Sequence, residues 1–326
     1  MAKSNEPLLA VQDLSIRYGA DVPLVEQLNF TVERGETVGL VGESGCGKSL
    51  TALAVMGLLP QNLKSGGGIR LGDTELTKLD ARSLRKIRGS QMAMIFQEPL
   101  TALNPVMTIG AQVVEVLRAH NKMSSADAER RAIELLELVR IPDAAARFND
   151  YPHRLSGGMR QRVVIAIAIA CNPALLIADE PTTALDVTVQ AQILRLLKRL
   201  QQDADLGLLL ITHDLGVVRQ VADRIVVMYA GSVVEEGPVD AVLDNPRHPY
   251  TAGLLAARPH GSHNAGAERL ADIRGTVPAP EARPGGCQFE PRCAYAQADC
   301  RAARPPLSLL AGGRALRCYH PVGGAH

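Results

Sequence analysis

Short apolar runs alternate with amphipathic stretches along most of this chain. Apolar runs with the length of buried strands lie at residues 37–41, 93–96, 174–178 and 208–212. Helical periodicity covers residues 50–56, 108–139, 156–170 and 187–202. Strands that alternate with helices in this way predict a mostly parallel α/β sheet.

Three regions depart from this alternation. Residues 8–38 alternate apolar and polar positions in short runs, as antiparallel strands do. Residues 64–68 read Lys-Ser-Gly-Gly-Gly, which predicts a turn. Residues 259–284 are rich in Gly, Pro, Ala and His, a composition that is typical of a linker.

The segment between the strand at 37–41 and the helix at 50–56 carries a phosphate-binding motif. It reads Gly42-Glu43-Ser44-Gly45-Cys46-Gly47-Lys48-Ser49, followed by Leu50, and it satisfies G-x-x-x-x-G-K-[ST] in the strand–loop–helix setting that this motif requires. The glycines let backbone N–H groups surround a polyphosphate, and the helix N-terminus adds favourable partial charge. We expect Lys48 to reach the β- and γ-phosphates of a nucleotide and Ser49 to bind Mg²⁺.

Two carboxylates follow a later apolar strand. Asp179 and Glu180 come directly after the run Leu175-Leu176-Ile177-Ala178. In a chain with a phosphate loop, the first acid at such a strand end holds Mg²⁺, and the second can polarise the attacking water. The pair therefore predicts hydrolysis of the bound nucleotide.

The composition limits the function classes. Hydrophobic residues make up 46% of 326 residues, enough for one large domain plus a smaller one. The net charge of +1, the 3% aromatic content and the absence of Trp argue against a nucleic-acid-binding surface. The start of the chain lacks the pattern of a secretory signal, and the longest apolar run, residues 163–171, is far shorter than the ~20 residues of a membrane-spanning helix. We therefore expect a soluble, cytosolic chain, so any membrane role must come through partners.

A third motif identifies the family. Leu155-Ser156-Gly157-Gly158-Met159-Arg160-Gln161-Arg162 resembles the signature of ATP-binding cassette (ABC) ATPases. Ser156 is expected to cap the helix that follows, and the Gly157 and Gly158 amides at the helix N-terminus form a second anion-binding site. The resemblance implies that this surface faces the γ-phosphate held by another subunit, so that two chains enclose two nucleotides.

Four further positions match the family residue by residue. Gln97, at the end of its strand, resembles the Q-loop glutamine that contacts Mg²⁺ or water and links the site to the transmembrane partner. Asp186, in Ala184-Leu185-Asp186, resembles the D-loop, which contacts the opposite subunit. His213 resembles the switch histidine that senses the γ-phosphate, and Tyr18 resembles the aromatic residue that stacks on adenine.

The resemblance also implies the fold and the domain organisation. We expect a P-loop ABC ATPase domain over residues 1–258, with a RecA-like core, an antiparallel β subdomain and a helical subdomain at roughly residues 98–170. Residues 259–326 would form a small Cys-rich C-terminal extension.

The cysteines of this extension predict a metal site. Cys287, Cys293, Cys300 and Cys318 follow the spacing C-x5-C-x6-C-x17-C. Disulfides are disfavoured in a cytosolic chain. Four thiolates suit zinc or a 4Fe–4S cluster, and spacing alone leaves these two open beside a minority alternative of reduced structural thiols.

Longer segments resemble one group within the family. Residues 96–105, 177–186 and 245–251, followed by Gly-Cys-x5-Cys, are similar to the ATPase subunits of bacterial dipeptide and oligopeptide importers, most of all to the first ATPase subunit of a dipeptide importer. Members of that group carry four C-terminal cysteines at a 4Fe–4S site, so the resemblance favours the cluster over zinc.

This resemblance implies a complete transport machine. The partners would be a second, different ABC ATPase subunit, two transmembrane permease subunits and a periplasmic or extracellular peptide-binding protein, with this chain peripheral at the cytoplasmic face of the inner membrane. Nickel, glutathione and antimicrobial-peptide importers use similar subunits and remain alternatives for the solute. A non-transport ABC ATPase that acts on nucleic acid or ribosomes, and a redox-sensing role for the cysteines, are alternatives of other classes.

Overall fold

The computed structural model describes residues 6–19, 22–98, 102–183, 185–257 and 273–323. Contacts between residues divide the chain into two compact units. The first unit comprises residues 1–9, 32–37 and 70–211, and the second comprises residues 10–31, 38–69 and 212–326. A strand that extends across a boundary between the two units is assigned to the unit that contains most of its residues. None of the helices in the described ranges combines the length and the apolar character needed to cross a membrane.

The first unit is mainly helical. Its strands are β5 (Thr74–Glu75), β6 (Met92–Ile95), β7 (Leu175–Asp179) and β8 (Gly207–Thr212). Its α-helices are α2 (Ala81–Ile87), α4 (Ile109–His120), α5 (Ser125–Leu138), α6 (Ala144–Arg147), α7 (Gly157–Ile169) and α8 (Val187–Ala204).

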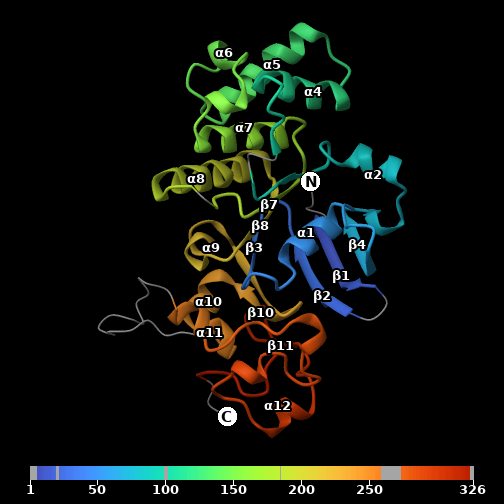
Figure 1. Ribbon diagram of the computed structural model, residues 1–326, viewed down its shortest axis with the longest axis vertical. Coiled ribbons are helices and arrows are strands. Elements are labelled where there is room, and N and C mark those ends of the chain that lie inside the picture. Colours follow the sequence, from blue (N-terminus) through green and yellow to red (C-terminus); the bar gives the residue numbers. More distant parts are fainter. Residues whose placement is uncertain (1–5, 20–21, 99–101, 184, 258–272, 324–326) are drawn as a thin grey trace. The chain divides into compact units, whose positions relative to one another are not determined.

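Three parallel strands and a group of helices organise this unit. Strand β7 pairs in parallel with β6 on one side and with β8 on the other, and all its residues are buried. Helices α4 and α5 pack against each other and on α7, and α6 packs on α5 (Figure 1). Buried strands beside helices are what the apolar runs at 93–96, 174–178 and 208–212 predict, so these predictions are confirmed.

Polar side chains fix where the helices of the first unit begin. The N-cap side chains of α4, α5, α7 and α8 each accept a hydrogen bond from an amide of the first turn; they are Thr108, Ser124, Ser156 and Asp186. The prediction of Ser156 as an N-cap is confirmed. The helical periodicity predicted over 108–139 is confirmed and comprises two helices, because Ser124 caps a new helix after a break at residues 121–124.

The second unit is mainly β structure. Its strands are β1 (Leu9–Tyr18), β2 (Val22–Val32), β3 (Thr37–Val41), β4 (Leu63–Leu71), β9 (Arg224–Tyr229), β10 (Ser232–Pro238), β11 (Ser308–Leu310) and β12 (Arg314–Leu316). Its α-helices are α1 (Lys48–Val55), α9 (Leu215–Val221), α10 (Val239–Asp244), α11 (Pro249–Ala256) and α12 (Ala298–Ala302).

Two groups of strands form this unit. Strand β3 pairs in parallel with β9, which continues antiparallel through β10 and β12 to β11. Strands β2, β1 and β4 lie side by side in that order. The turn predicted at residues 64–68 is wrong, because these residues lie inside β4. Glycine there permits close approach of two strands: a Cβ on Gly67 would lie 2.5 Å from the carbonyl oxygen of Asp13 in β1.

The C-terminal residues 273–323 belong to the second unit, and several of their arginines bond to it alongside the pairing of β12 with β10. Few of their apolar side chains are buried, among them Phe289, Ala315 and Leu316. Five arginines instead bond to groups elsewhere in the unit. These are Arg283 to the carbonyls of Pro23 and Leu24, Arg292 to Glu43, Arg304 to Glu26 and Ser232, Arg314 to Glu235, and Arg317 to the carbonyl of Val233.

The most deeply buried of these bonds joins β12 to β10. Glu235 is fully buried, and its Oε1 accepts from Arg314 Nη2 at 2.6 Å and from the Arg247 amide at 2.9 Å. Its Oε2 accepts from the His248 amide at 3.0 Å. The carboxylate therefore has three donors, which offset the cost of burying its charge.

Removing this carboxylate should loosen the attachment of β12. We expect Glu235→Ala to lower the free energy of opening of β10 and β12 amides by about 3–5 kcal/mol, because Arg314 is left as a buried charge without its partner. Native-state hydrogen exchange measures this quantity segment by segment. Glu134→Ala, which breaks an exposed pair with Arg131, is the control and should cost at most about 1 kcal/mol. Equal losses in both variants would contradict the assignment.

Candidate functional site

The phosphate-loop motif lies between β3 and α1 in the second unit. Helix α1 begins at Lys48 without a side-chain cap on its N-terminus. Among the residues that the structure describes, the amides of Gly45, Gly47 and Ser49 donate to no protein acceptor. Open amides at a helix N-terminus are donors for an anion, so the local geometry fits a polyphosphate.

Two glycines of the loop are required by its backbone. Gly47 has φ of 101°, and a Cβ there would lie 2.7 Å from Val25 Cγ2. Gly42 has φ of 155°, and a Cβ would lie 2.2 Å from the Met228 carbonyl oxygen. Cys46 is fully buried, and burial raises the pKa of its thiol, although the Lys48 ammonium beside it opposes this shift.

The lysine of the loop is held by backbone carbonyls. Lys48 Nζ donates to the Gly42 carbonyl at 2.7 Å and to the Glu43 carbonyl at 3.0 Å. Because the side chain is only 6% exposed, its ammonium is kept inside the loop rather than in solvent. The charge is therefore already positioned for an anion.

Hydrogen bonds hold the amide, the carbonyl and the carboxylate of Glu43 in place. Its amide donates to the Tyr250 hydroxyl at 2.9 Å, and its carboxylate receives two bonds from Arg292, at 2.6 and 3.0 Å. The bonds to Glu43 raise the pKa of Arg292 above its ordinary value, while burial raises that of Tyr250. Sequence reasoning missed Arg292 and Tyr250, which lie more than two hundred positions from the loop.

A second group of predicted residues comes together in the first unit, at the carboxyl end of β7. Glu180 Oε2 accepts from Gln97 Nε2 at 3.2 Å and from Thr183 Oγ1 at 2.9 Å. Asp179, the last residue of β7, is 5% exposed. Glu180 has a left-handed φ of 46°, a conformation that is costly outside glycine and that concentrates at functional sites.

Thr183 is a residue of this group that sequence reasoning missed. The motifs found in the sequence assign it no role. In the structure its hydroxyl donates to the Glu180 carboxylate, and its amide donates to the Glu180 carbonyl at 3.2 Å. These two bonds close a tight turn after β7, and this turn orients the carboxylate.

The signature residues begin α7. Ser156 and Gly157 are exposed, and Ser156 Oγ accepts from the Met159 amide at 3.4 Å. A Cβ on Gly158 would lie 2.6 Å from Val189 Cγ1 of α8, so a larger residue would push the two helices apart. Asp186 caps α8 by accepting from the Val189 amide at 2.9 Å.

The remaining predicted residues have simple positions. His213 directly follows β8 and belongs to the second unit. Tyr18 ends β1 and is 53% exposed. Ala184 of the predicted D-loop lies outside the described residues. The structure thus joins Gln97 to Glu180 in the first unit and Lys48 to the loop carbonyls in the second.

The four C-terminal cysteines line one pocket. Its empty volume is about 300 Å³, part of it open to solvent. The Sγ atom of Cys293 accepts a hydrogen bond from the Tyr295 amide at 3.4 Å. Burial raises the pKa of Cys287 and Cys293 and raises that of Cys318 to about 12, and nearby thiolates add to the shift.

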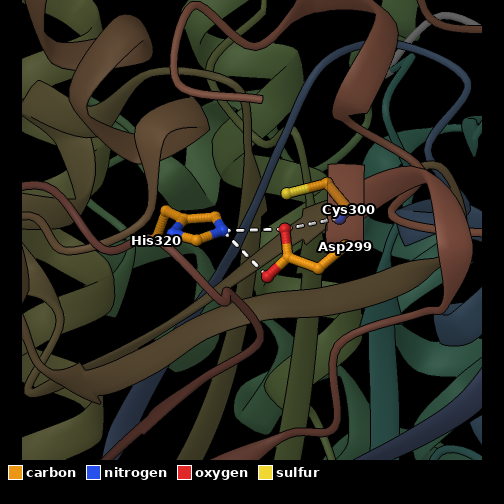
Figure 2. Close-up of side chains that lie close together, drawn as sticks. All are labelled: Asp299, Cys300 and His320. Carbon is orange, nitrogen blue, oxygen red and sulfur yellow. Dashed lines mark hydrogen bonds and ion pairs between the residues drawn. The ribbon is translucent and has the colours of Figure 1, made fainter. Parts of the chain in front are cut away.

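A hydrogen-bonded side-chain pair joins two of the cysteine-bearing segments. His320 Nε2 lies 2.8 and 2.9 Å from the two carboxylate oxygens of Asp299, which precedes Cys300 (Figure 2). The ligand atoms of Asp299, Cys300 and His320 lie within 4.8 Å of one another. This group shares Cys300 with the four-thiol pocket, so it is not an independent site. The pair ties the segment of Cys300 to that of Cys318, and bonding to His320 lowers the pKa of Asp299.

Comparison with known proteins places these features in a family. Residues 25–183 match the family described as "ABC transporter", and residues 234–300 match "Oligopeptide/dipeptide transporter, C-terminal region". The "Dipeptide transport ATP-binding protein DppD" of Escherichia coli K12 is 48% identical over 323 residues, which are 98% of this chain and 98% of the relative. The "Oligopeptide transport ATP-binding protein AppD" of Bacillus subtilis 168 is 50% identical over 317 residues, which are 96% of each.

Solved structures agree with this result. An ATP-binding cassette in a dimeric post-hydrolysis state, bound to ADP and Pi, superposes with a TM-score of 0.64 at 30% identity and covers 71% of this chain and 98% of its own. The predicted α/β cassette fold is confirmed. This chain belongs to the ABC transporter family of ATP-binding proteins, in the branch that carries the oligopeptide/dipeptide transporter C-terminal region.

Proposed function

We propose that this chain is the ATP-hydrolysing subunit of an ABC importer for dipeptides or short oligopeptides. One observation carries the solute class: a phosphate loop is joined in one chain to the C-terminal region of oligopeptide/dipeptide transporters. Two relatives with dipeptide or oligopeptide transport in their names, each about half identical along nearly the whole chain, support it. The chain would act at the cytoplasmic face of the inner membrane.

The phosphate loop would hold the triphosphate of ATP. The open amides of Gly45, Gly47 and Ser49 are its donors, and the Lys48 ammonium would move from the loop carbonyls to the phosphates. Ser44, Cys46 and Leu50 complete the loop backbone around these donors. The family resemblance assigns Ser49, Asp179 and Gln97 as oxygen ligands of Mg²⁺, which would neutralise phosphate charge.

Hydrolysis would depend on the group at the end of β7. Glu180 would accept a proton from the attacking water, and the bonds from Gln97 and Thr183 would keep its carboxylate in one orientation. His213 would stabilise γ-phosphate charge, and exposed Tyr18 would stack on adenine. Positioning and charge neutralisation supply most of the rate in such reactions.

The signature would act on a second nucleotide. Ser156, Gly157 and Gly158 lie at an exposed helix N-terminus that suits the γ-phosphate held by another ATPase subunit, and Asp186 lies at the start of the next helix. We propose that this partner is a different ATPase subunit. Closure of the pair on ATP would act on two permease subunits that receive peptide from an external binding protein.

We further propose that Cys287, Cys293, Cys300 and Cys318 hold a 4Fe–4S cluster. All four line one pocket, and the Tyr295 amide donates to the sulfur of Cys293. A tetrahedral zinc ion with bonds of about 2.3 Å needs sulfurs within about 4 Å of one another. Across the described residues, no three of these thiols lie within 4.8 Å of one another. The resemblance to importer ATPase subunits with a 4Fe–4S site is what favours the cluster over zinc.

The cluster would act as a staple. The described C-terminal residues bury little apolar surface, so cross-linking by a bound group would add order that their own core does not supply. On this proposal the ATPase domain covers residues 1–258, with its helical subdomain at roughly 98–170, and the extension covers residues 259–326.

Glu180→Gln tests the assignment of the base. The variant keeps the bonding shape but cannot take a proton, so we expect ATP binding to persist while turnover in the assembled transporter falls by about 10²–10⁴-fold. Steady-state phosphate release and nucleotide trapping measure the two properties. Glu129→Gln, on the exposed face of α5, is the matched control and should hydrolyse ATP normally. Turnover near that of the wild type in Glu180→Gln would remove Glu180 from this role.

Metal analysis tests the cluster. Protein purified without oxygen should contain iron and acid-labile sulfide in equal amounts, with a broad visible absorbance band. Cys293→Ser should lose iron, whereas Cys171→Ser, a thiol of the first unit, should retain it. Zinc in place of iron, or wild-type protein that contains neither metal, would overturn the cluster assignment without affecting the ATPase assignment.

A further inference from the structure

The C-terminal segment contributes a side chain to the phosphate loop. Arg292 precedes Cys293, and its guanidinium makes two bonds to the Glu43 carboxylate, from Nη1 to Oε2 at 2.6 Å and from Nη2 to Oε1 at 3.0 Å. Two parallel bonds of this kind are among the strong charge-assisted pairs in proteins. The Arg292 side chain is 5% exposed and that of Glu43 is 29% exposed, so the pair is only partly screened by solvent.

Arg292 is itself held in place by several contacts. Its Nε donates to the Arg274 carbonyl at 2.9 Å, and Nη2 also donates to the Ile273 carbonyl at 3.3 Å. The guanidinium lies over the rings of Tyr229 and Phe289, at 5.7 and 6.0 Å from their centroids. A fixed guanidinium imposes a fixed position on the carboxylate that it binds.

Glu43 creates a problem that this contact solves. It brings a negative charge into a loop that binds an anion, and a like charge there disfavours the ligand. Its own carbonyl lies 3.0 Å from Lys48 Nζ, so a carboxylate released from Arg292 could turn toward the same ammonium. Lys48 would then pair with Glu43 instead of the phosphates.

We propose that Arg292 is a positioning residue of the nucleotide site: it neutralises Glu43 and keeps that carboxylate away from Lys48. Through this bond the C-terminal segment sets the ATP affinity of the loop. The inference rests on the proposed function, in which ATP is the ligand of the loop. It assigns to the extension a direct role at the nucleotide site beyond that of a staple.

Nucleotide binding in the assembled transporter tests this role. Arg292→Gln should weaken MgATP binding to this chain roughly tenfold, because the charge-assisted bonds between Arg292 and Glu43 are lost and Lys48 is drawn to the free Glu43 carboxylate. KM for ATP should rise by a similar factor while kcat changes by less than about twofold, because Glu180 is untouched. Photolabelling with an azido-ATP analogue resolves this chain from the second ATPase subunit on a gel.

Charge-specific variants separate positioning from a purely structural effect. Adding Glu43→Gln to Arg292→Gln should restore most of the affinity, and Glu43→Gln alone should bind MgATP as well as the wild type or better. The loss of MgATP affinity in Arg292→Gln should be smaller at high salt, because salt screens the charge of the unpaired Glu43 carboxylate from the phosphates and from Lys48. Arg301→Gln is the matched control: Arg301 bonds to Glu290 within the C-terminal segment at 2.7 Å, and its loss should leave MgATP binding unchanged.

Several outcomes would overturn the inference. Wild-type affinity in a folded Arg292→Gln variant would do so, as would a loss that Glu43→Gln fails to rescue or that salt does not change. If Arg292→Gln does not fold, Arg292→Lys serves in its place, because it keeps the charge but loses one bond to Glu43. Unchanged MgATP affinity in Arg292→Lys together with a large loss of affinity in Glu43→Gln alone would contradict the positioning role of Arg292. A wild-type complex that binds no MgATP would instead overturn the proposed function.

Discussion

An anion-binding loop that contains its own carboxylate depends on a cation to neutralise it. In this chain Glu43 occupies the second position of the phosphate loop, and Arg292 supplies the cation from the C-terminal segment. The same glutamate is bonded through its amide to Tyr250 and through its carbonyl to Lys48. The loop can therefore stay rigid while the amides of Gly45, Gly47 and Ser49 remain open, the combination that phosphate binding needs.

The attachment of the C-terminal segment follows the same physics. Its buried apolar side chains are few, and arginines reach from it to carboxylates and carbonyls of the second unit. The buried pair of Arg314 with Glu235 is the strongest example, since the carboxylate also accepts from two backbone amides. A segment held by oriented charges rather than by a large core takes up a defined position only when all its bonds form together, which is why a cross-link through four cysteines fits this region.

Features that lie within one short segment can be predicted from the sequence, whereas contacts between residues far apart in the sequence cannot. The phosphate loop, the acids after β7 and the helix capped by Ser156 each lie within one short segment, so motif and periodicity suffice to find them. The bond between Arg292 and Glu43 spans 249 positions, and nothing distinguishes Arg292 from the other arginines near it in the sequence. No motif assigns a role to Thr183, and its bond to Glu180 depends on a tight turn that the sequence does not reveal.

One structural prediction failed for a physical reason, and the helical prediction at 108–139 holds but does not show the break between its two helices. The glycines at 66–68 indicate a turn by composition, but they lie in β4, where the absence of a side chain on Gly67 lets β1 approach. The helical pattern at 108–139 continues across the break before Ser124, because apolar periodicity alone does not register the cap that starts a new helix. The strands β9 and β10 had no motif to mark them.

Transport by purified components tests the central claim most directly, that ATP hydrolysis on this chain drives peptide uptake. The chain would be reconstituted in liposomes with its permeases, its second ATPase subunit and its binding protein, with MgATP supplied on the side of the ATPase subunits. The account predicts that labelled dipeptide accumulates in the compartment that contains ATP, against its concentration gradient, and that a non-hydrolysable ATP analogue abolishes accumulation. ATP hydrolysis that continues without any dipeptide or oligopeptide uptake would contradict it.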